Sequence, residues 1–232
     1  MAEHDKAVRR VPGDLRKETK AEARVIRLPI ERLDEAADLF ARSFHTNPNF
    51  MDLLPDERAR GSALSRRFEA SLRDASGFGH VYAATREAES SAGDELAGVA
   101  VWLPPCAFPL SAARQLRALP GMAGVMATAP LSTLRLLWYT VGIARLHPAQ
   151  PYWYLEVAGV DPTVRGLGIG TRLVEPVLAL AAEAGQTCYL ETMTERNVAW
   201  YRSLGFEVRE AGVRFLRGSP PDWTMMQPPR QR

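Results

Sequence analysis

A glycine-rich turn in the carboxyl-terminal half of the chain has the residue types and spacing of an anion-binding site. The stretch from Val160 to Leu173 predicts the end of a strand, a turn and the start of a helix. Its glycines at 166, 168 and 170 let the backbone approach a ligand closely. The first amides of the following helix have no intrahelical acceptor and lie at the positive end of its dipole. We therefore expect this turn to bind phosphate oxygens.

The glycine spacing narrows the class of phosphate compound. The dinucleotide fingerprint needs G-x-G-x-x-G, and Thr171 stands where its last glycine would fall. The phosphate loop of nucleotide hydrolases needs a lysine after its last glycine, and none follows here. The pattern that is present is R-x-x-G-x-G, formed by Arg165, Gly168 and Gly170.

A second motif lies between Glu191 and Phe206, in the stretch E-T-M-T-E-R-N-V-A-W-Y-R-S-L-G-F. Asn197 and Tyr201 are four residues apart, so both lie on the same face of a predicted helix. This spacing allows the two side chains to contact one ligand. The alternative for Tyr201 is a core position, with its ring packed beside Leu204 and Phe206.

Both motifs resemble the signature of the GCN5-related N-acetyltransferase (GNAT) family, in which V-x-P precedes R-x-x-G-x-G and N-x-x-x-Y-x-x-x-G-F follows a later strand. Here V-x-P is Val160 and Pro162. The likeness is closest to puromycin N-acetyltransferase-like proteins and covers residues from about 150 to 228. It includes Pro176 inside the helix after the turn, whereas Arg165 stands where the pattern also takes glutamine. The amino-terminal half, which largely sets acceptor specificity, matches only in outline.

The resemblance implies that acetyl-CoA is the co-substrate, and it assigns roles to individual residues. The loop amides would hold the CoA pyrophosphate, and the preceding strand backbone would bond the pantetheine arm and polarise the acetyl carbonyl. Tyr201 would give a proton to the departing thiolate; a thiol pKa of about 8.5 and a phenol pKa of about 10 are close enough for this transfer. The implied cofactor-binding residues are Ala158, Gly159, Val160, Arg165, Gly166, Leu167, Gly168, Ile169, Gly170 and Asn197.

The attacking amine must be neutral, and most amines are protonated at pH 7, so a base is also needed. Two carboxylates are candidates: Glu156 lies inside an otherwise apolar predicted strand, and Glu191 ends the neighbouring one. Strict alternation places Glu156 on the same face as Tyr154 and Ala158, opposite Val157. Charged residues inside strands are depleted unless they have partners. Either carboxylate could instead face solvent or pair with an arginine, and the sequence does not choose between them.

Aromatic and histidine residues give weaker signals. The side chains of Tyr152, Trp153 and Tyr154 could line an acceptor pocket, but alternating aromatic residues more often form core and cross-strand pairs. A further hypothesis places three residues after the first predicted helix at the border of the acceptor site: Phe44, His45 and Asn49. The four histidines have no ligand spacing with a second histidine, cysteine or carboxylate cluster, so we expect no metal site.

Hydrophobic periodicity predicts the elements that position these residues. We expect residues 1–22, which are densely charged, to form a disordered extension and residues 23–232 to form a single domain. Predicted strands are 24–28, 81–85, 96–103, 152–160, 187–191, 206–210 and 223–226, and predicted helices are 30–44, 57–74, 168–184 and 196–204. Two or three short helices in 110–147 are expected to pack over the substrate side.

This order of elements predicts an α/β fold. With the resemblance, we expect a GNAT-like mixed, mostly antiparallel central sheet with helices on both faces. The sheet should splay between the strands 152–160 and 187–191, where CoA would enter.

Composition limits the partners and the compartment. The 29 Lys and Arg residues exceed the 27 Asp and Glu residues by only two. This small excess does not indicate the concentrated basic face that a nucleic-acid partner needs. The longest uncharged run, 118–134, contains two prolines and is too short for a membrane span. No secretory or transit signal is visible, and Cys106 and Cys188 suit core positions in a reducing compartment. We expect a cytoplasmic protein without nucleic-acid or membrane partners, and a homodimer stays open.

The predicted reaction is direct transfer of an acetyl group to a primary amine of a small molecule, which could be an antibiotic such as puromycin. A covalent acetyl-enzyme is not required, and Cys188 on a core face is a poor nucleophile. One alternative is a non-catalytic acyl-CoA-binding sensor, against which an intact Tyr201 argues. The other is an acyltransferase that uses a longer acyl-CoA.

Overall fold

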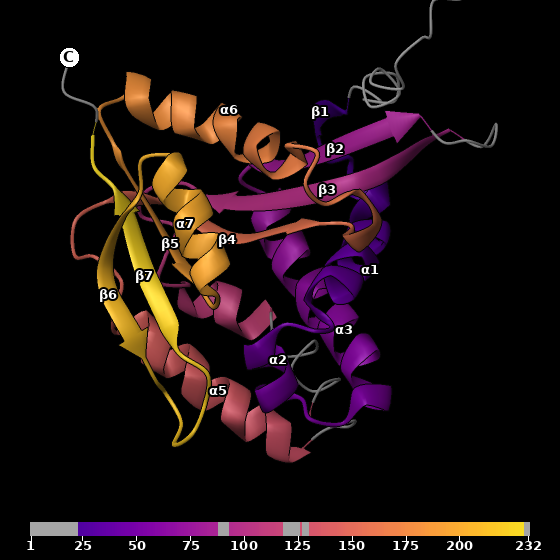
Figure 1. The fold of residues 1–232 in the computed structure, drawn as a ribbon, viewed down its shortest axis with the longest axis vertical. Coiled ribbons are helices and arrows are strands. Elements are labelled where there is room, and N and C mark those ends of the chain that lie inside the picture. The colour runs from indigo at the N-terminus through magenta and orange to yellow at the C-terminus, as the bar shows by residue number, and fades with distance from the viewer. Residues whose placement is uncertain (1–22, 88–92, 118–125, 127–129, 230–232) are drawn as a thin grey trace, which may run out of the picture.

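The computed structural model describes residues 23–87, 93–117, 126 and 130–229 (Figure 1). These residues contain a seven-stranded sheet with the order β1-β2-β3-β4-β5-β7-β6. Its neighbouring strands are antiparallel except β4 and β5, which run parallel. The strands are β1 (Arg24–Arg27), β2 (Val81–Glu87), β3 (Asp94–Leu103), β4 (Tyr152–Val160), β5 (Thr187–Thr192), β6 (Glu207–Val213) and β7 (Asp222–Gln227).

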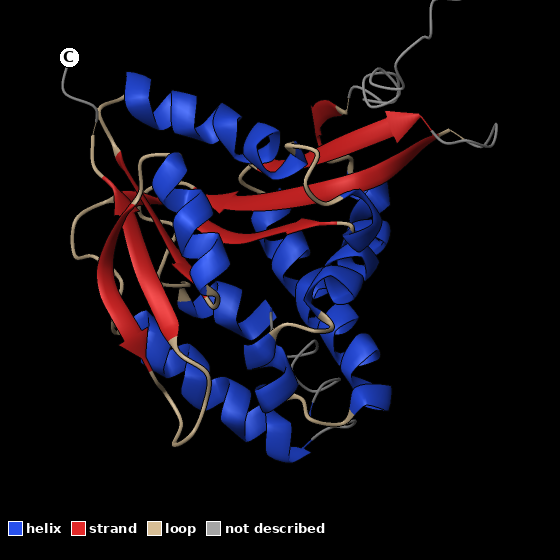
Figure 2. Ribbon diagram, viewed as in Figure 1, coloured by secondary structure: helices blue, strands red, loops and turns tan. Residues whose placement is uncertain are grey.

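Helices cover both faces of this sheet (Figure 2). In Figure 1, α6 lies above the strands, and α1 and α3 lie below them. Residues 112–117 are also helical. The remaining helices are η1 (Ile30–Arg32), α1 (Leu33–Phe44), α2 (Pro48–Leu53), α3 (Glu57–Ser76), α5 (Pro130–Ala144), η2 (Pro162–Val164), α6 (Ile169–Glu183) and α7 (Glu195–Ser203).

Each face of the sheet has its own hydrophobic core. Under one face, α1 buries a stripe at helical spacing that includes Ala36, Ala37 and Phe40, all nearly inaccessible to solvent. Over the other face, α6 buries Leu173, Val177 and other apolar residues. The helices α1 and α6 thus pack on opposite faces of the sheet.

The GNAT-like architecture predicted from the sequence is confirmed, and the structure adds a short helix that periodicity did not reveal. The helix α2 is capped by Asn47, whose side chain accepts hydrogen bonds from the amides of Asn49 and Phe50, and Pro48 occupies its first turn. An asparagine followed by proline is a known helix-start signal, so the sequence did contain this information. One cysteine differs from expectation: Cys188 is buried, but Cys106 is exposed in the loop after β3.

A β-bulge at Glu156 breaks the alternation predicted for β4. Val101 of β3 pairs with Val157, and the next residue of β3 pairs with Leu155, so Glu156 is the extra residue. Val157 therefore packs with Tyr154 on the α1 side, whereas Ala158 joins the α6 side. The predicted assignment of Ala158 and Tyr154 to one face is wrong because the bulge shifts the period by one residue.

The bulge coincides with the point where β4 and β5 separate. Their parallel pairing ends at Leu155 and Leu190, and after it Glu191 pairs only with β7. The predicted splay between these strands is therefore present. Within the described residues, no helix has both the length and the apolar character needed to cross a membrane. The expected extension 1–22 lies outside the described residues, so the domain boundary at 23 stays a prediction.

Candidate active site

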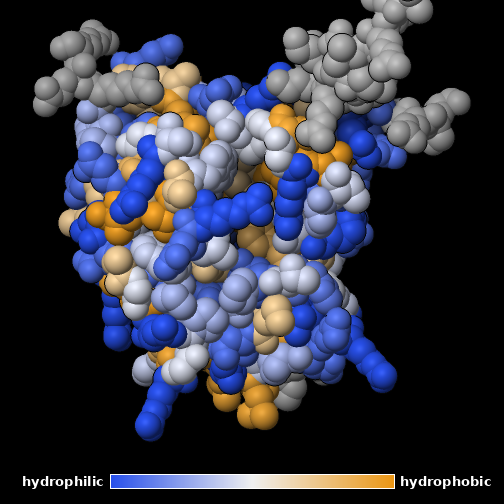
Figure 3. Space-filling view, viewed as in Figure 1, coloured by the Kyte–Doolittle hydropathy of each residue, from blue (hydrophilic) through white to orange (hydrophobic). Residues whose placement is uncertain are grey.

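The splay between β4 and β5 opens into a cavity with about 650 Å³ of empty space, a figure that includes open solvent. Side chains of α1, α2, α3 and α7 complete its walls. Figure 3 shows a hollow near the centre of this face, with hydrophobic atoms at its floor and hydrophilic side chains at its rim. The predicted site residues that line the cavity are Glu156, Ala158, Glu191, Asn197 and Tyr201.

The glycine-rich turn forms an open cup at the start of α6. Gly166 and Gly168 have φ angles of +86° and +78°, which favour glycine, and an added Cβ at either position would meet no atom within 4 Å. The backbone amides of residues 165–171 donate no hydrogen bond to any described residue. Gly170 differs, because its Cβ would lie 3.1 Å from the Trp200 ring. The cup therefore has backbone N–H groups without acceptors, and a pyrophosphate could accept hydrogen bonds from them.

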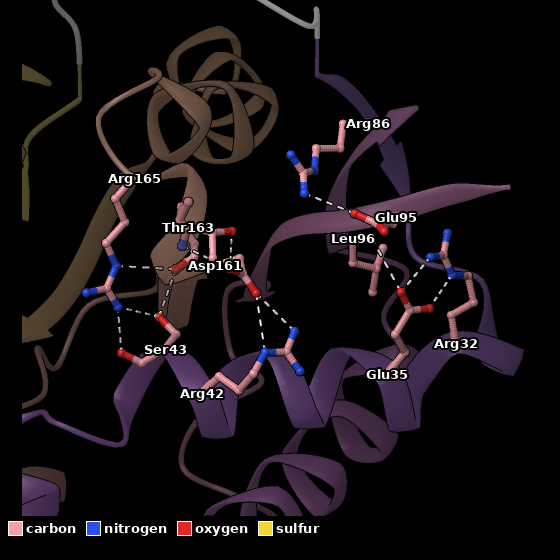
Figure 4. Close-up of polar contacts among 11 residues, drawn as sticks. Arg32, Glu35, Arg42, Ser43, Arg86, Glu95, Leu96, Asp161, Thr163 and Arg165 are labelled. Atoms are coloured by element: carbon pink, nitrogen blue, oxygen red, sulfur yellow. Dashed lines mark hydrogen bonds and ion pairs between the residues drawn. The ribbon is translucent and has the colours of Figure 1, made fainter. Parts of the chain in front are cut away.

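The carboxyl end of α1 holds this turn in place (Figure 4). Ser43 donates through Oγ to the Val160 carbonyl at 3.2 Å, and Arg165 donates through Nη2 to the Ser43 carbonyl at 2.7 Å. Arg42 forms an ion pair with Asp161 at 3.0 Å. The side chain of Arg165 is thus bonded to α1. Sequence reasoning missed Arg42 and Ser43, since only the fold brings them to the turn.

Glu156 projects into the cavity from the bulge. Ser71 of α3 donates a hydrogen bond through Oγ to Glu156 Oε1 at 2.6 Å. Burial raises the pKa of the Glu156 carboxyl, and the Ser71 hydrogen bond and the nearby Arg67 charge partly oppose this rise. The result is a carboxylate with one strong donor and an increased affinity for a proton, which are the properties of a base.

One carboxylate oxygen of Glu191 accepts a hydrogen bond, and the other lies near a histidine. Tyr154 donates its hydroxyl to Oε2 at 2.9 Å, and His147 Nε2 lies 3.0 Å from Oε1, at ion-pair distance but without hydrogen-bond geometry. The Nδ1 atom of His147 lies 2.5 Å from the Tyr152 hydroxyl, and its ring stacks on Phe108 with centroids 4.0 Å apart. Sequence analysis weighed His147 only as a metal ligand. No local spacing predicts its contact with Glu191, which depends on the tertiary fold.

Tyr201 lies on α7 with its ring between those of Trp200 and Phe206. Burial raises its pKa above the ordinary value of a phenol, so the hydroxyl stays protonated in the neutral range. This widens the gap to the pKa of a thiol and favours hydrogen bonding to a thiolate over early proton transfer. Asn197, one helical turn earlier, lines the same cavity.

Several other predicted residues lie elsewhere. Of the three residues expected at the border of the acceptor site, Phe44 at the end of α1 lines the cavity. Asn49 is buried and donates its side-chain amide to both oxygens of Asp222 at 2.9 and 2.8 Å. The main chain of His45 accepts from Arg60. The remaining aromatic hypothesis concerned three residues of β4, all of which are buried core residues rather than cavity lining: Tyr152, Trp153 and Tyr154.

The expectation that residues 110–147 pack over the substrate side stays a prediction, and in their described part His147 lies 3.0 Å from Glu191 of the cavity wall. None of these described residues lines the cavity. Instead, α5 lies beside α2 and the β6–β7 connection, where Trp138 donates through Nε1 to the Phe215 carbonyl at 3.1 Å. In the described parts of the chain, no group of three or more His, Cys, Asp or Glu residues is placed to hold a metal ion.

Comparison with known proteins agrees with this geometry. Residues 133–206 match the profile described as the acetyltransferase (GNAT) family. A segment of 84 residues is 39% identical to N-alpha-acetyltransferase RimI of Mycobacterium tuberculosis, covering 35% of this chain and 52% of that protein. A segment of 87 residues is 34% identical to an uncharacterized protein of Mycobacterium leprae, covering 37% of this chain and 24% of that protein. The chain thus spans about half the length, or less, of these curated relatives.

Solved structures share the fold over most of the chain. A structure described as a histone acetyltransferase and related acetyltransferase from Corynebacterium glutamicum superposes with a TM-score of 0.67 at 23% identity, covering 90% of this chain and 98% of that one. Arylalkylamine N-acetyltransferase 2 from Aedes aegypti gives 0.55 at 15% identity, covering 89% and 99%. Residues 133–206 are thus similar to the acetyltransferase (GNAT) family, and the described chain shares the fold of these solved acetyltransferase structures.

Proposed function

We propose that this protein transfers the acetyl group of acetyl-CoA to a primary amine of a small molecule. The observation that carries the proposal is the cavity at the β4–β5 splay, which is lined by two carboxylates and a phenol, together with the open glycine cup that follows the same strand β4. GNAT-family proteins use an acyl-CoA co-substrate. We propose in addition that the acyl group is acetyl and that the acceptor is a small molecule.

The residues of the cup fit the pyrophosphate of CoA. Gly166 and Gly168 leave space for its oxygens, and the amides of residues 165–171 supply donors at the amino-terminal end of α6. The pantetheine arm would follow the edge of β4 at Ala158 and Gly159, which faces the splay once β5 has diverged. The Val160 carbonyl already accepts a hydrogen bond from Ser43, so it is less available to bond the pantetheine arm than the sequence suggested.

We assign the base to Glu156 and an orienting role to Glu191. Glu156 has a raised pKa and a single hydrogen-bond donor, so it can accept a proton from the ammonium or from the attacking amine. Glu191 is held by Tyr154 and His147 and supplies fixed negative charge near the amine. The amine nitrogen forms a bond to the acetyl carbon, the carbon–sulfur bond breaks, and Tyr201 donates a hydrogen bond and then a proton to sulfur.

Direct transfer suits this cavity better than a covalent acetyl-enzyme. Cys188 lies in the core, and burial raises the pKa of its thiol to about 12, so it is a poor nucleophile at neutral pH. The second cysteine, Cys106, is exposed in the loop after β3 and does not line the cavity. The transfer therefore needs the acyl-CoA and the amine bound together.

The decisive experiment measures CoA release with a panel of antibiotics including puromycin, polyamines, amino acids and peptide amino termini. The peptides belong in the panel because RimI is named as an N-alpha-acetyltransferase. We expect turnover with at least one class, and a loss of about 100-fold in kcat for Tyr201→Phe with acetyl-CoA affinity little changed. The matched control is Tyr82→Phe, since Tyr82 is buried in β2 away from the cavity. Tight CoA binding without turnover of any amine would instead favour the sensor.

A further inference from the structure

The helix α5 turns apolar side chains toward solvent and hydroxyl-bearing side chains toward the protein. Thr133 and Tyr139 are only 2% and 8% exposed. By contrast, Leu131, Leu134 and Trp138 are 78%, 66% and 61% exposed. A helix on the surface of a soluble monomer has the opposite pattern, with its apolar residues toward the core and its polar residues outward. The outward face of α5 therefore has the composition of a covered surface.

The exposed apolar residues of α5 form one continuous stripe. Positions 131, 134, 138 and 141 recur at intervals of three or four residues, which places them along one face of the helix. The α5 stripe is defined by its exposed members: Leu131, Leu134, Leu137, Trp138 and Val141. Figure 3 shows hydrophobic side chains at the lower end of the molecule, where α5 lies in Figure 1. A contiguous apolar patch of this kind marks an interaction surface.

Contacts on the other sides of α5 fix the direction in which the stripe faces. Arg135 forms an ion pair with Asp52 of α2 at 2.7 Å. Tyr139 donates its hydroxyl to Asp222 of β7 at 3.0 Å, and Ile143 is buried in the core. Rotation of the helix to bury the stripe would break these contacts. The stripe is therefore a fixed surface of the folded chain.

The charge pattern of α5 favours an identical surface as its partner. Arg135 is the only charged residue from Pro130 to Ala144, and Asp52 neutralises it. Two copies of this uncharged stripe can meet without the like-charge repulsion that opposes most self-association. A helix that binds a lipid surface instead carries several lysines and arginines on its polar face. The inward face of α5 has no such residues and packs against the protein.

The exposed area of the stripe also suits a symmetric pair. Its five side chains are between 38% and 78% exposed. They leave on the order of 100 Å² each, or about 500 Å² per protomer, which is the size of a large functional patch. Two such faces would bury on the order of 1,000 Å², near the lower limit of specific interfaces. This area predicts a pairing that depends on concentration rather than an obligate dimer.

We propose that two copies of this chain pair through the α5 stripe, with their α5 helices antiparallel. Antiparallel helices place the positive amino-terminal end of each dipole beside the negative carboxyl-terminal end of the other. The two-fold axis then passes near position 136, so Leu134 faces Trp138 of the second copy and Leu131 faces Val141 of the second copy. This interface is independent of the proposed acetyl transfer.

Sedimentation velocity over a range of protein concentrations measures the pairing. The wild type should pass from monomer to dimer with a Kd on the order of 10 µM. Leu134→Glu and Val141→Glu should each raise the Kd at least about 10-fold, because the symmetric interface would bury two unpaired carboxylates. The matched control is Ile30→Glu, since Ile30 is 65% exposed and lies in η1 rather than in the stripe. We expect the Kd of this control to stay within about twofold of the wild-type value.

Cysteine cross-linking tests the antiparallel arrangement. Cys106 is exposed, so both chains first carry Cys106→Ser. A mixture of Leu131→Cys chains and Val141→Cys chains, treated with a short bismaleimide linker, should give more cross-linked dimer than either variant alone. Antiparallel pairing brings positions 131 and 141 together, whereas two copies of position 131 lie at opposite ends of the interface.

Monomers at every concentration would overturn the inference, whether the stripe is then covered by another part of this chain or by a lipid surface. A dimer that neither Leu134→Glu nor Val141→Glu weakens would overturn it too, since the copies would pair elsewhere. Stronger cross-linking of Leu131→Cys chains to one another than to Val141→Cys chains would indicate parallel helices and contradict the proposed arrangement.

Discussion

The two halves of the candidate site are built in different ways. The proposed cofactor half uses main-chain groups from one continuous segment, 158–170, and its glycines set the shape of the cup. The proposed acceptor half uses side chains from α1, α2, α3, β4, β5 and α7, brought together at the β4–β5 splay. Backbone donors depend little on side-chain identity, so the first half leaves a short readable pattern. The second half depends on which distant side chains meet.

The largest effect that would test this difference is expected at Gly168. Gly168→Val forces a β-branched residue into a positive φ and obstructs the cup, so CoA affinity should fall at least about 100-fold by calorimetry. Gly185→Val is the matched control, because Gly185 also has a positive φ (+62°) and open space but lies beyond the other end of α6. Equal loss of CoA affinity in the two variants would mean that only helix stability was tested.

The next effect concerns the acceptor half. Glu156→Gln should lower kcat/KM for the amine about 100-fold at pH 7, because an amide cannot accept the proton, while CoA affinity stays within about twofold. Glu191→Gln should cost about 10-fold, since this residue orients the amine rather than accepting its proton. Glu175→Gln on the exposed face of α6 serves as control. The reverse order of the two losses would assign the base to Glu191.

A buried carboxylate behind the acceptor half should make stability depend on pH. Burial raises the pKa of Asp222 to about 7, although Tyr139 and Asn49 donate to it. The folded protein then binds a proton that the unfolded chain releases near pH 4. The free energy of unfolding should therefore fall as pH rises from about 4 to about 7, by up to about 1.4 kcal/mol per pH unit from this group.

Urea unfolding across this pH range checks the prediction. Asp222→Asn should flatten the slope relative to the wild type, even if its overall stability is lower because an amide now faces Asn49. An unchanged slope would show that Asp222 does not hold the proton.

The smallest effect sharpens the assignment of the base. Ser71→Ala removes the hydrogen bond that lowers the pKa of Glu156, so the acidic limb of the kcat/KM profile should move to higher pH by about one unit. Ser65→Ala is the matched control, because Ser65 lies on the same helix and donates to Asp38 at 2.7 Å outside the cavity. If the limb does not move with Ser71→Ala, it belongs to another group than Glu156.

Sequence patterns predicted the elements with long periodicity and the segments with local chemistry. The stripe of α6, the glycine cup and the helical spacing of Asn197 and Tyr201 are all local, because each depends on residues within a few positions of one another. The short helix α2 had a readable cap at Asn47 and Pro48 but too few residues for a periodic signal.

Tertiary structure alone decided the rest. The bulge at Glu156 changes which side of β4 each following residue faces, and it arises from pairing with β3 rather than from any local preference. Ser71, Arg67 and His147 reach the two carboxylates from segments far away in the sequence. Hydrogen bonds and burial act over a few ångströms in space, and separation along the chain does not encode those distances. The sequence thus determined the fold class and the glycine-rich motif, whereas folding decided what surrounds each of the two carboxylates.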